Sequence, residues 1–312
     1  MSLTHFPNGL TSFGVPVLGA GPMIVTGNVY FVDSGHAAAE DTPAGGTHDR
    51  PYATMDYANG RCTANNGDLV IVMPGHTETV IAAAGLDLDT AGVTWIGIGS
   101  GDNRPTVNFT TAVGADMDVD AANITMCNFL FTGGIDALTG PIDVNAADFQ
   151  LLNCETRDVT GQATDWIVTD ANADRLLIDG WVHRGAAAAG ADTAITIVGG
   201  DNITIIPKFI DGNFAVAAIE NVTTAAVNLQ VFGSATYPAY IRNRNAVDVI
   251  VTAVATTTGR MGPFINARLT DNAANITEAF VGADMEFFQP INIVNADGES
   301  SMQTNITATT DA

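Results

Sequence analysis

A loosely repeated phrase runs along this chain: a small polar turn, a short stretch of alternating apolar residues, and a turn that ends in glycine. It occurs as DAANITMCNFLFTGG from Asp120, NAADFQLLNCETRDVTG from Asn145, NADRLLIDGWVHRG from Asn172, GGDNITIIPKFIDGN from Gly199 and NAVDVIVTAVATTTG from Asn245. A chain that repeats one short unit is predicted to stack copies of one structural element.

Each repeat opens on an Asn or Asp, which serves as its anchor. The anchors are Asn123, Asp148, Asp174, Asn202, Asp248 and Asn275, which lie 25, 26, 28, 46 and 27 residues apart. The longest gap spans two repeats, and the segment AAVNLQVFG from Ala225 lies near its middle. A period in the mid-twenties predicts units that cannot bury their apolar faces alone and therefore stack on their neighbours.

The first and third residues after an anchor are mostly apolar, which predicts a strand rather than a helix. These pairs are Ile124 and Met126, Phe149 and Leu151, Ile203 and Ile205, and Val249 and Val251, with Arg175 and Leu177, and Ile276 and Glu278, as partial exceptions. Two or three such strands make one turn of a coil in which inward side chains stack at about 4.8 Å. The predicted fold class is all-β, a right-handed parallel β-helix solenoid.

The fifth residue after three of the anchors is Asn128, Asn153 or Asp179. This spacing predicts a ladder of hydrogen-bonded polar side chains at one corner of the turns, although Asn also simply favours turns. The Leu-x-x-Leu-x-Leu signature of a leucine-rich repeat is absent, and a propeller blade is longer than this repeat. A β-sandwich, which also uses regularly spaced short strands, is the main alternative.

The chain divides into three regions. Residues 1–28 are predicted to form an extended N-terminal arm, because their prolines forbid a regular helix. Its apolar side chains are predicted to contact a partner, and they are Phe6, Phe13, Val15 and Val17. Residues 29–282 are predicted to form the β-helix body, and residues 283–312 a C-terminal packing element and tail.

A short helix is predicted over residues 51–60, near the start of the body. Asp49 or Arg50 would precede it, and Pro51 would take the first helical position, where its missing N–H costs nothing. Such a capping helix would cover the open end of the solenoid, since the first turn exposes unpaired strand edges. The stack itself is predicted to begin with a strand over residues 69–73.

Composition and charge limit the possible partners. Hydrophobic residues make up 46% of the chain, enough for a large core, whereas charged residues make up only 14%. The net charge of −23 and the single lysine, Lys208, argue against a nucleic-acid partner and against an anionic membrane. The acidic surface is expected to keep molecules apart, with calcium-dependent assembly as the alternative.

Cys62, Cys127 and Cys154 have neither the number nor the spacing of a disulfide framework or a zinc site. We expect buried free thiols, which suits folding in a reducing cytoplasm. The N-terminal segment MSLTHFPNGLTSFG has no signal-peptide pattern, and no run of about 18 apolar residues predicts a membrane span.

The segments VYFVDSG, GGTHDRPYATMDYA and NGDLVIVMPGHTET resemble the opening turns of pectate-lyase-like right-handed β-helix proteins. His76 and Thr77 stand where that family often has an aromatic residue. GIGSGDNRPTVNFTT with AANITMCNFLF resembles turns of phage virion proteins, and THFPNGLTSFGVPV resembles the N-termini of phage head-associated proteins. The resemblance covers residues 1 to about 160. It implies a fold and a virion context, and it implies no reaction.

Carboxylates are the strongest candidates for chemistry. Asp116, Asp118 and Asp120 alternate in GADMDVDAA, so all three are predicted to lie on one strand face. Unpaired, they would repel one another, and one of them would have a raised pKa. Such a set suits acid–base chemistry or a calcium site, and the alternative is a solvated strand edge that blocks aggregation.

The cationic residues are not predicted to converge. Arg157, Arg175 and Arg184 fall in adjacent repeats but at different positions relative to the anchors, so no cationic groove is expected. His183 is expected in a turn. The remaining histidines, which lack metal-ligand spacing, are His5, His36, His48 and His76.

The tryptophans Trp95, Trp166 and Trp181 fall in separate repeats and predict no aromatic row for sugars. No nucleophile elbow, P-loop or Ser-His-Asp motif is present in the sequence. We therefore predict no catalytic residue, no metal and no cofactor.

Together these features predict a non-enzymatic structural protein of a phage particle, a cement or decoration protein on the capsid exterior that is made in the host cytoplasm. The expected partners are the major capsid protein and further copies of this chain, as a homotrimer, because closed symmetry satisfies every interface. The alternative is a tailspike-like β-helix protein that degrades or binds polysaccharide.

Overall fold

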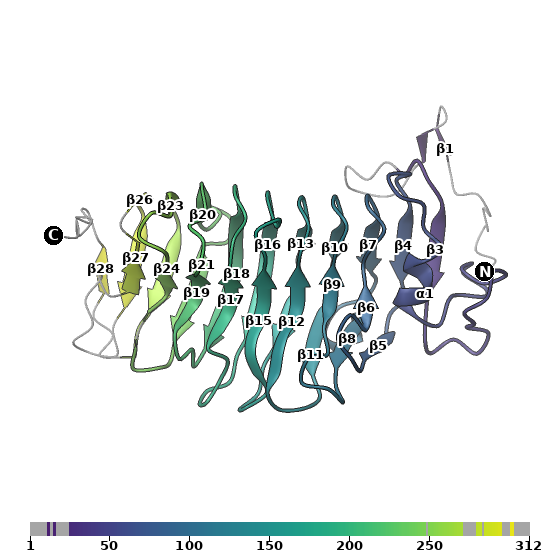
Figure 1. The fold of residues 1–312 in the computed structure, drawn as a ribbon, viewed down its shortest axis with the longest axis horizontal. Coiled ribbons are helices and arrows are strands. Elements are labelled where there is room, and N and C mark those ends of the chain that lie inside the picture. Colours follow the sequence, from purple (N-terminus) through teal and green to yellow (C-terminus); the bar gives the residue numbers. More distant parts are fainter. Residues whose placement is uncertain are drawn as a thin grey trace.

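The computed structural model describes residues 25–247, 249–270, 279–282 and 284–294, together with the backbone of β1 (Thr11–Ser12), β2 (Val15–Pro16) and β28 (Ser300–Met302). Over this range the chain is a solenoid of parallel strands stacked turn on turn (Figure 1). This confirms the predicted parallel β-helix and excludes the β-sandwich. The direction of winding stays a prediction.

The strands form three rows along the solenoid, because each complete turn contributes one strand segment to each row. The first row comprises β3 (Val29–Val32), β4 (Leu69–Val72), β7 (Thr94–Gly97), β10 (Thr125–Cys127), β13 (Gln150–Leu152), the first halves of β16 (Leu177–Arg184) and β18 (Thr204–Gly212), β20 (Leu229–Val231), β23 (Gly259–Met261) and β26 (Met285–Phe287).

The second row comprises β5 (Thr77–Val80), β8 (Thr106–Phe109), β11 (Leu130–Gly133), β14 (Glu155–Arg157), the second halves of β16 and β18, β21 (Ala239–Asn243), β24 (Ile265–Arg268) and β27 (Ile291–Val294). The third row is a separate eight-stranded sheet of β6 (Leu86–Asp87), β9 (Met117–Val119), β12 (Leu138–Val144), β15 (Ala163–Thr169), β17 (Thr193–Ile197), β19 (Ala217–Asn221), β22 (Val251–Thr252) and β25 (Phe280–Val281).

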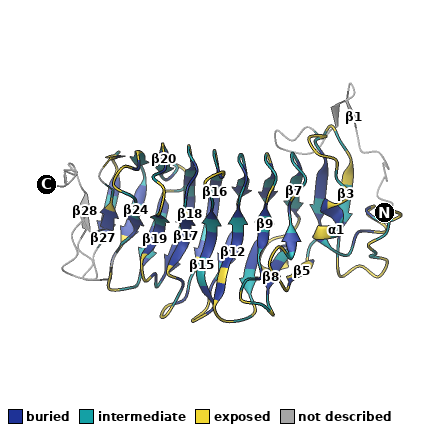
Figure 2. Cartoon of the chain, in the orientation of Figure 1, coloured by how far each residue is buried: buried dark blue, intermediate teal, exposed yellow. Residues whose placement is uncertain are grey.

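Inward-facing side chains stack in columns from one turn to the next. In the third row, successive pairing joins Leu86, Met117, Ile142, Ile167, Ile195, Ile219, Val251 and Phe280, all of them buried. Figure 2 shows this buried interior running the length of the solenoid. Burial of each such aliphatic side chain is worth roughly 1.5–3 kcal/mol, which is why the repeats keep apolar residues at these positions.

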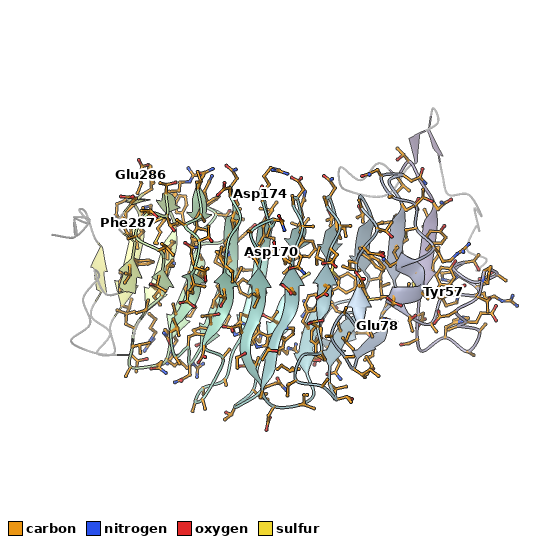
Figure 3. All side chains as sticks on the ribbon, in the orientation of Figure 1. Tyr57, Glu78, Asp170, Asp174, Glu286 and Phe287 are labelled. Atoms are coloured by element: carbon orange, nitrogen blue, oxygen red, sulfur yellow. The ribbon has the colours of Figure 1, made fainter. Side chains whose placement is uncertain are left out.

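Polar side chains lie along the outer edge of the solenoid, as Asp174 and Glu286 do in Figure 3. Among the described residues, no helix is long and apolar enough to cross a membrane. The three cysteines are free, as predicted. Only Cys154 is fully buried, and desolvation raises the pKa of its thiol to about 12.

Seven of the first-row strands, from β4 to β20, are each preceded by a residue with a left-handed backbone. These residues are Gly67, Gly92, Asn123, Asp148, Arg175, Asn202 and Asn228, with φ between 55° and 80°. The N–H of one donates to the next turn, as from Asn123 to the carbonyl of Ala147 at 3.1 Å. Asn and Asp tolerate this conformation better than other side chains do, which explains why they open the repeats.

One predicted anchor needs correction, and two others lie outside the described residues. The left-handed position is Arg175 rather than Asp174, a shift of one residue. Asp248 lies outside the described residues, and Asn228 has the left-handed backbone in the turn whose Val251 pairs with Ile219 in the third row. Asn275 lies outside the described residues.

The predicted side-chain ladder at the next corner is wrong. Asn128 donates its amide to the backbone carbonyls of Gly97 and Gly99, at 2.8 and 3.1 Å. Asn153 lies against Gly180, where a Cβ would stand 2.5 Å from its Oδ1. Since the anchor is one residue later than predicted, a glycine occupies the third place of this corner and no ladder continues.

The short helix α1 (Met55–Asn59) lies within the predicted range of 51–60, but its predicted start at Pro51 is wrong. Tyr52 pairs with Val32 in an isolated parallel bridge, so residues before the helix are extended. Thr54 is the N-cap, and its hydroxyl accepts from the N–H of Tyr57 at 3.2 Å. The helix packs against β3 and β6, and its role as a cover for the open end stays a prediction.

The stack begins earlier than predicted, because β3 pairs in parallel with β4 in front of the strand expected at 69–73. At the other end β26 and β27 pair in parallel with β23 and β24, so the described turns continue to Val294. β28 then pairs antiparallel with β27.

Candidate functional site

Four arginines line up on the outer face of the second strand row. Arg157 pairs with Arg184 on the next turn, Arg184 pairs with Asp211, and Asp211 pairs with Arg242. Arg268 follows Arg242 on the next turn. We call Arg157, Arg184, Arg242 and Arg268 the arginine row.

The prediction that Arg157 and Arg184 occupy different positions is therefore wrong. Both lie nine residues after their true anchors, Asp148 and Arg175, and the misplaced anchor concealed this spacing. Arg175 itself lies apart from the row. Its guanidinium binds both carboxylate oxygens of Asp148, with Nε–Oδ1 at 2.7 Å and Nη2–Oδ2 at 2.8 Å.

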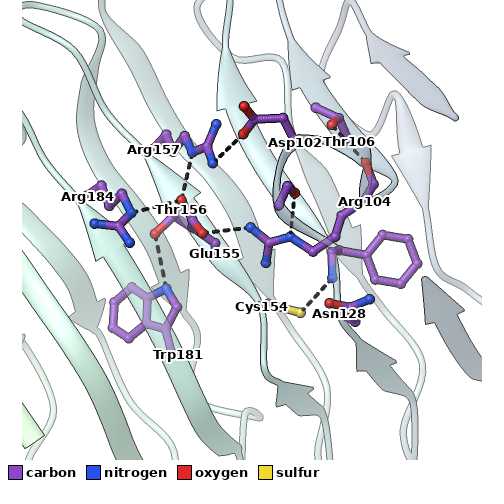
Figure 4. Close-up of polar contacts among 12 residues, drawn as sticks. Asp102, Arg104, Thr106, Asn128, Cys154, Glu155, Thr156, Arg157, Trp181 and Arg184 are labelled. Carbon is purple, nitrogen blue, oxygen red and sulfur yellow. Dashed lines mark hydrogen bonds and ion pairs between the residues drawn. The ribbon is translucent and has the colours of Figure 1, made fainter. Parts of the chain in front are cut away.

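Glu155 is a buried carboxylate at one end of the arginine row, and three arginines donate to it (Figure 4). Its Oε2 accepts from Arg104 Nη2 at 2.6 Å, and its Oε1 accepts from Arg157 Nε at 2.7 Å. Arg184 Nε donates to the same Oε1 at 3.1 Å. Arg157 also contacts exposed Asp102 at 2.8 Å. The network ties together turns that are far apart in sequence.

Electrostatics keeps Glu155 ionised. Burial by itself would raise the pKa of this carboxyl, but the hydrogen bonds from Arg157 and Arg104 outweigh burial and lower the pKa. Desolvation by itself would lower the pKa of Arg157, but its bonds to Glu155 and Asp102 outweigh desolvation and raise that pKa. A carboxylate held in this state is a poor proton donor, so the network is suited to holding turns together rather than to acid catalysis.

Asp211 is the second buried carboxylate of this face. Arg244 Nε donates to its Oδ1 at 2.7 Å and Arg244 Nη2 to its Oδ2 at 2.5 Å. Beside it, the rings of Phe209 and Tyr240 stack with centroids 5.3 Å apart and planes 10° apart. The guanidinium of Arg184 lies 5.4 Å from the centre of the Phe209 ring. Two stacked aromatic rings therefore lie beside the arginine row at this point of the outer face.

The third strand row carries the opposite charge. Asp118 pairs with Asp87 on one side and with Asp143 on the other, so their carboxylates follow one another along the outer face. Asp116 and Asp118 flank buried Met117, which confirms the predicted alternation. Exposed Asp120 accepts from Asn145 Nδ2 at 3.0 Å.

This acidic row has raised pKa values, as the sequence predicted for at least one member. Desolvation and the neighbouring carboxylates raise the pKa of Asp118 to about 7. Desolvation also raises the pKa of Asp87, Asp116 and Asp143. Within the described part of the chain, no group of three or more His, Cys, Asp or Glu side chains has the geometry to hold a metal ion.

His183 is a core residue and not the turn residue that was predicted. It lies in the inward column of β16, fully buried among Trp166, Trp181 and Phe214. Its Nδ1 lies 2.8 Å from the hydroxyl of Thr156, and its Nε2 is buried without a hydrogen-bond partner. Desolvation lowers the pKa of His183 to about 3, so the ring stays neutral.

Exposed Ser34 and buried His76 and Glu78 are residue types seen in catalytic triads, but their geometry is different. The N–H of Ser34 donates to His76 Nδ1 at 2.9 Å, while its hydroxyl accepts from the N–H of Thr77 at 3.0 Å. Glu78 lies 3.3 Å from His76 Nε2 and accepts from the N–H of Met55 at 2.6 Å. These bonds fasten α1 to the first turns and leave the hydroxyl unactivated.

All three tryptophans are fully buried in the core, so none contributes to an exposed aromatic row. The exposed face instead uses Phe209 and Tyr240, which the sequence analysis did not single out. Of the predicted partner contacts, Phe6, Phe13 and Val17 lie outside the described residues. Val15 lies in β2, whose backbone pairs with β1, and its side chain is not described.

Comparison of the chain with protein-family models, with curated proteins and with solved structures found no match.

Proposed function

We propose that this chain is a non-enzymatic structural protein of a phage particle, a cement or decoration protein on the capsid exterior. Its partners would be the major capsid protein and two further copies of itself. The resemblance of residues 1 to about 160 to phage virion and head-associated proteins supports the virion context. The solenoid would wind right-handed, as in the pectate-lyase-like proteins that its first turns resemble.

The observation that carries the structural role is the Glu155 network. The buried carboxylate accepts hydrogen bonds from Arg104, Arg157 and Arg184, which come from three different turns. Separating those turns would leave a buried charge without partners, which is strongly unfavourable. A rod braced in this way suits a protein whose task is to resist deformation.

The mechanism would be thermodynamic coupling. A protein that binds only the assembled shell stabilises the assembled state, so opening of the shell costs more when the protein is bound. The acidic surface, with a net charge of −23, would keep neighbouring particles dispersed.

A cryo-electron microscopy map of the phage particle tests this proposal. We expect density for the solenoid on the capsid exterior, together with a lower temperature of genome release from particles that lack the protein. Density at the tail tip, or no density on the particle, would contradict the proposal.

A second function is favoured by one observation, the acidic row. Asp118, with a pKa raised to about 7, lies beside Asp116 and Asp143, and glycoside hydrolysis uses a pair of carboxyl groups of which one donates a proton. Incubation with host polysaccharide tests this function by the release of reducing ends. Release that is abolished by Asp118→Asn and kept by Asp120→Asn would replace the structural proposal with the enzymatic one.

A further inference from the structure

The outer surface of the described solenoid separates charge by strand row. The second-row strands contain the acids Glu78, Glu155 and Asp211, and all three are buried at 6–8% exposure. Their arginines point outward, and Arg184 keeps 59% of its side chain exposed. The exposed charge of the second-row strands is therefore positive on a chain whose net charge is −23.

The third row shows the reverse pattern. The described strands of this row contain no Lys or Arg. Besides Asp87, Asp118 and Asp143, the row carries Glu220, and desolvation together with the nearby carboxylates of Asp165 and Asp192 raises the pKa of that residue. Unlike Glu155 and Asp211 of the second row, these have no arginine partner within the described residues.

An apolar corner separates the two rows. Exposed aliphatic side chains recur in the turns between second-row and third-row strands, and they are Ile81, Val113, Val159, Val216 and Val247, with 38–57% exposure. A recurrent line of exposed valines with charge on both flanks has the composition of a protein contact surface, which combines an apolar centre with a polar rim.

We infer that copies of this chain associate side by side, with the arginine row of one copy against the acidic third row of the next and the corner valines at the junction. A second copy is the occupant that the charges favour, because each molecule presents both halves of the contact. A contact between two different surfaces of identical chains closes into a ring when its rotation allows.

An arginine of the second row and a carboxylate of the third row lie in the same turn, and therefore at the same level along the solenoid axis. Asp192 directly precedes β17, in the same turn as Arg184, and Asp165 lies in β15, in the same turn as Arg157. Two copies with parallel axes and aligned turns would therefore bring arginines opposite carboxylates. The half-buried carboxylates that repel one another in the monomer would gain cationic partners.

Sedimentation of the purified full chain at micromolar concentration, at low and high salt, tests the inference. We expect an oligomer that weakens with salt, because the contact is electrostatic. Arg184→Glu and Asp192→Arg should each weaken association on the order of a hundred-fold, since they create like-charge contacts. The double variant Arg184→Glu/Asp192→Arg should restore association, because it exchanges the two charges within the same contact.

Arg175→Glu is the matched control. Arg175 has 53% exposure and also pairs with a carboxylate, but it lies at a different corner, so its reversal should leave the mass of the oligomer unchanged. Val159→Asp provides a second test that leaves the Glu155 network intact, and it should also dissociate the oligomer. Circular dichroism verifies that each variant is folded, and Arg268→Glu replaces Arg184→Glu if that variant unfolds.

A wild-type chain that stays monomeric at both salt concentrations would overturn the inference. Reversal variants that are folded and still associate would overturn it as well. The inference rests on the proposed self-association but not on the phage particle. A map of the particle that lacks this protein would contradict the capsid role but not the contact between copies. A monomeric chain in solution would contradict that contact but not binding to the major capsid protein.

Discussion

Arg104 donates a 2.6 Å hydrogen bond to Glu155, although the complete turn containing β10 and β11 lies between the turns that carry them. A bond that reaches past a neighbouring turn couples parts of the solenoid that share no strand pairing. Since both side chains are nearly buried, the bond has consequences that can be measured.

Replacement of Glu155 by Gln should lower the free energy of unfolding by about 3–5 kcal/mol, because the nearly buried guanidinium of Arg104 loses its counter-charge. Urea unfolding at neutral pH, followed by circular dichroism, measures this loss. Asp102→Asn is the control, since Asp102 is 84% exposed and its ion pair should contribute at most about 1 kcal/mol. Equal losses for the two variants would show that the buried network has no special role.

His183 should make the protein sensitive to acid. Its pKa is lowered from 6.5 to about 3 in the fold, so the neutral ring stabilises the native state above pH 6.5, and this contribution is lost as pH falls toward 3. The loss should reach up to about 5 kcal/mol. Thermal melting between pH 7 and pH 4 measures it, and His183→Gln, which does not titrate, should flatten the acid limb of the curve. An unchanged limb would contradict the prediction.

Asp118 should change the stability with pH in the opposite direction to His183, so that its contribution decreases as pH rises. Its pKa is raised to about 7, so its contribution to stability is present at low pH and is lost as pH rises toward 7. Asp118→Asn should therefore stabilise the protein at pH 8 by about 1–2 kcal/mol, a figure reduced for solvent screening. Melting temperatures at pH 8 and pH 5 measure the difference, with exposed Asp120→Asn as the control. A destabilised variant at pH 8 would show that the charge is compensated.

Gly180 should tolerate no side chain. Its φ is +71°, and a Cβ would stand 2.5 Å from Asn153 Oδ1. Gly180→Ala should cost about 1–2 kcal/mol or more, because an L-residue resists this backbone conformation. Gly114→Ala is the matched control, since nothing lies within 4 Å of its would-be Cβ and its φ is not left-handed. Denaturant titration that ranks the two variants equally would contradict the prediction.

The period of the repeats and the alternation within them were sufficient to predict a parallel β-solenoid. Ile124 and Met126 are buried as expected, because a column of stacked turns accepts only apolar side chains at inward positions. The alternation of Asp116 and Asp118 was predictable for the same reason. Prediction failed at the level of a single residue, where Arg175 and not Asp174 takes the left-handed position.

That one-residue difference had large effects, because a shift of one position in a strand turns every side chain to the opposite face. Because of this shift, the prediction missed the alignment of Arg157 with Arg184. It also assigned Asp179 to the corner position that Gly180 occupies in the structure. The burial of His183 was equally hidden, since its neighbours Trp166 and Phe214 come from other strands and meet it only in the folded core.

Local patterns were therefore enough to establish which segments become strands and that these strands stack. The alternation of apolar residues and the preferences of turn residues depend on only a few consecutive positions, so the sequence shows them directly. Only the tertiary structure determines how side chains align between turns. This alignment depends on which corner residue adopts a left-handed backbone and on how many residues each corner contains. That alignment assembled the arginine row, the acidic row and the Glu155 network from residues that lie on different turns of the solenoid.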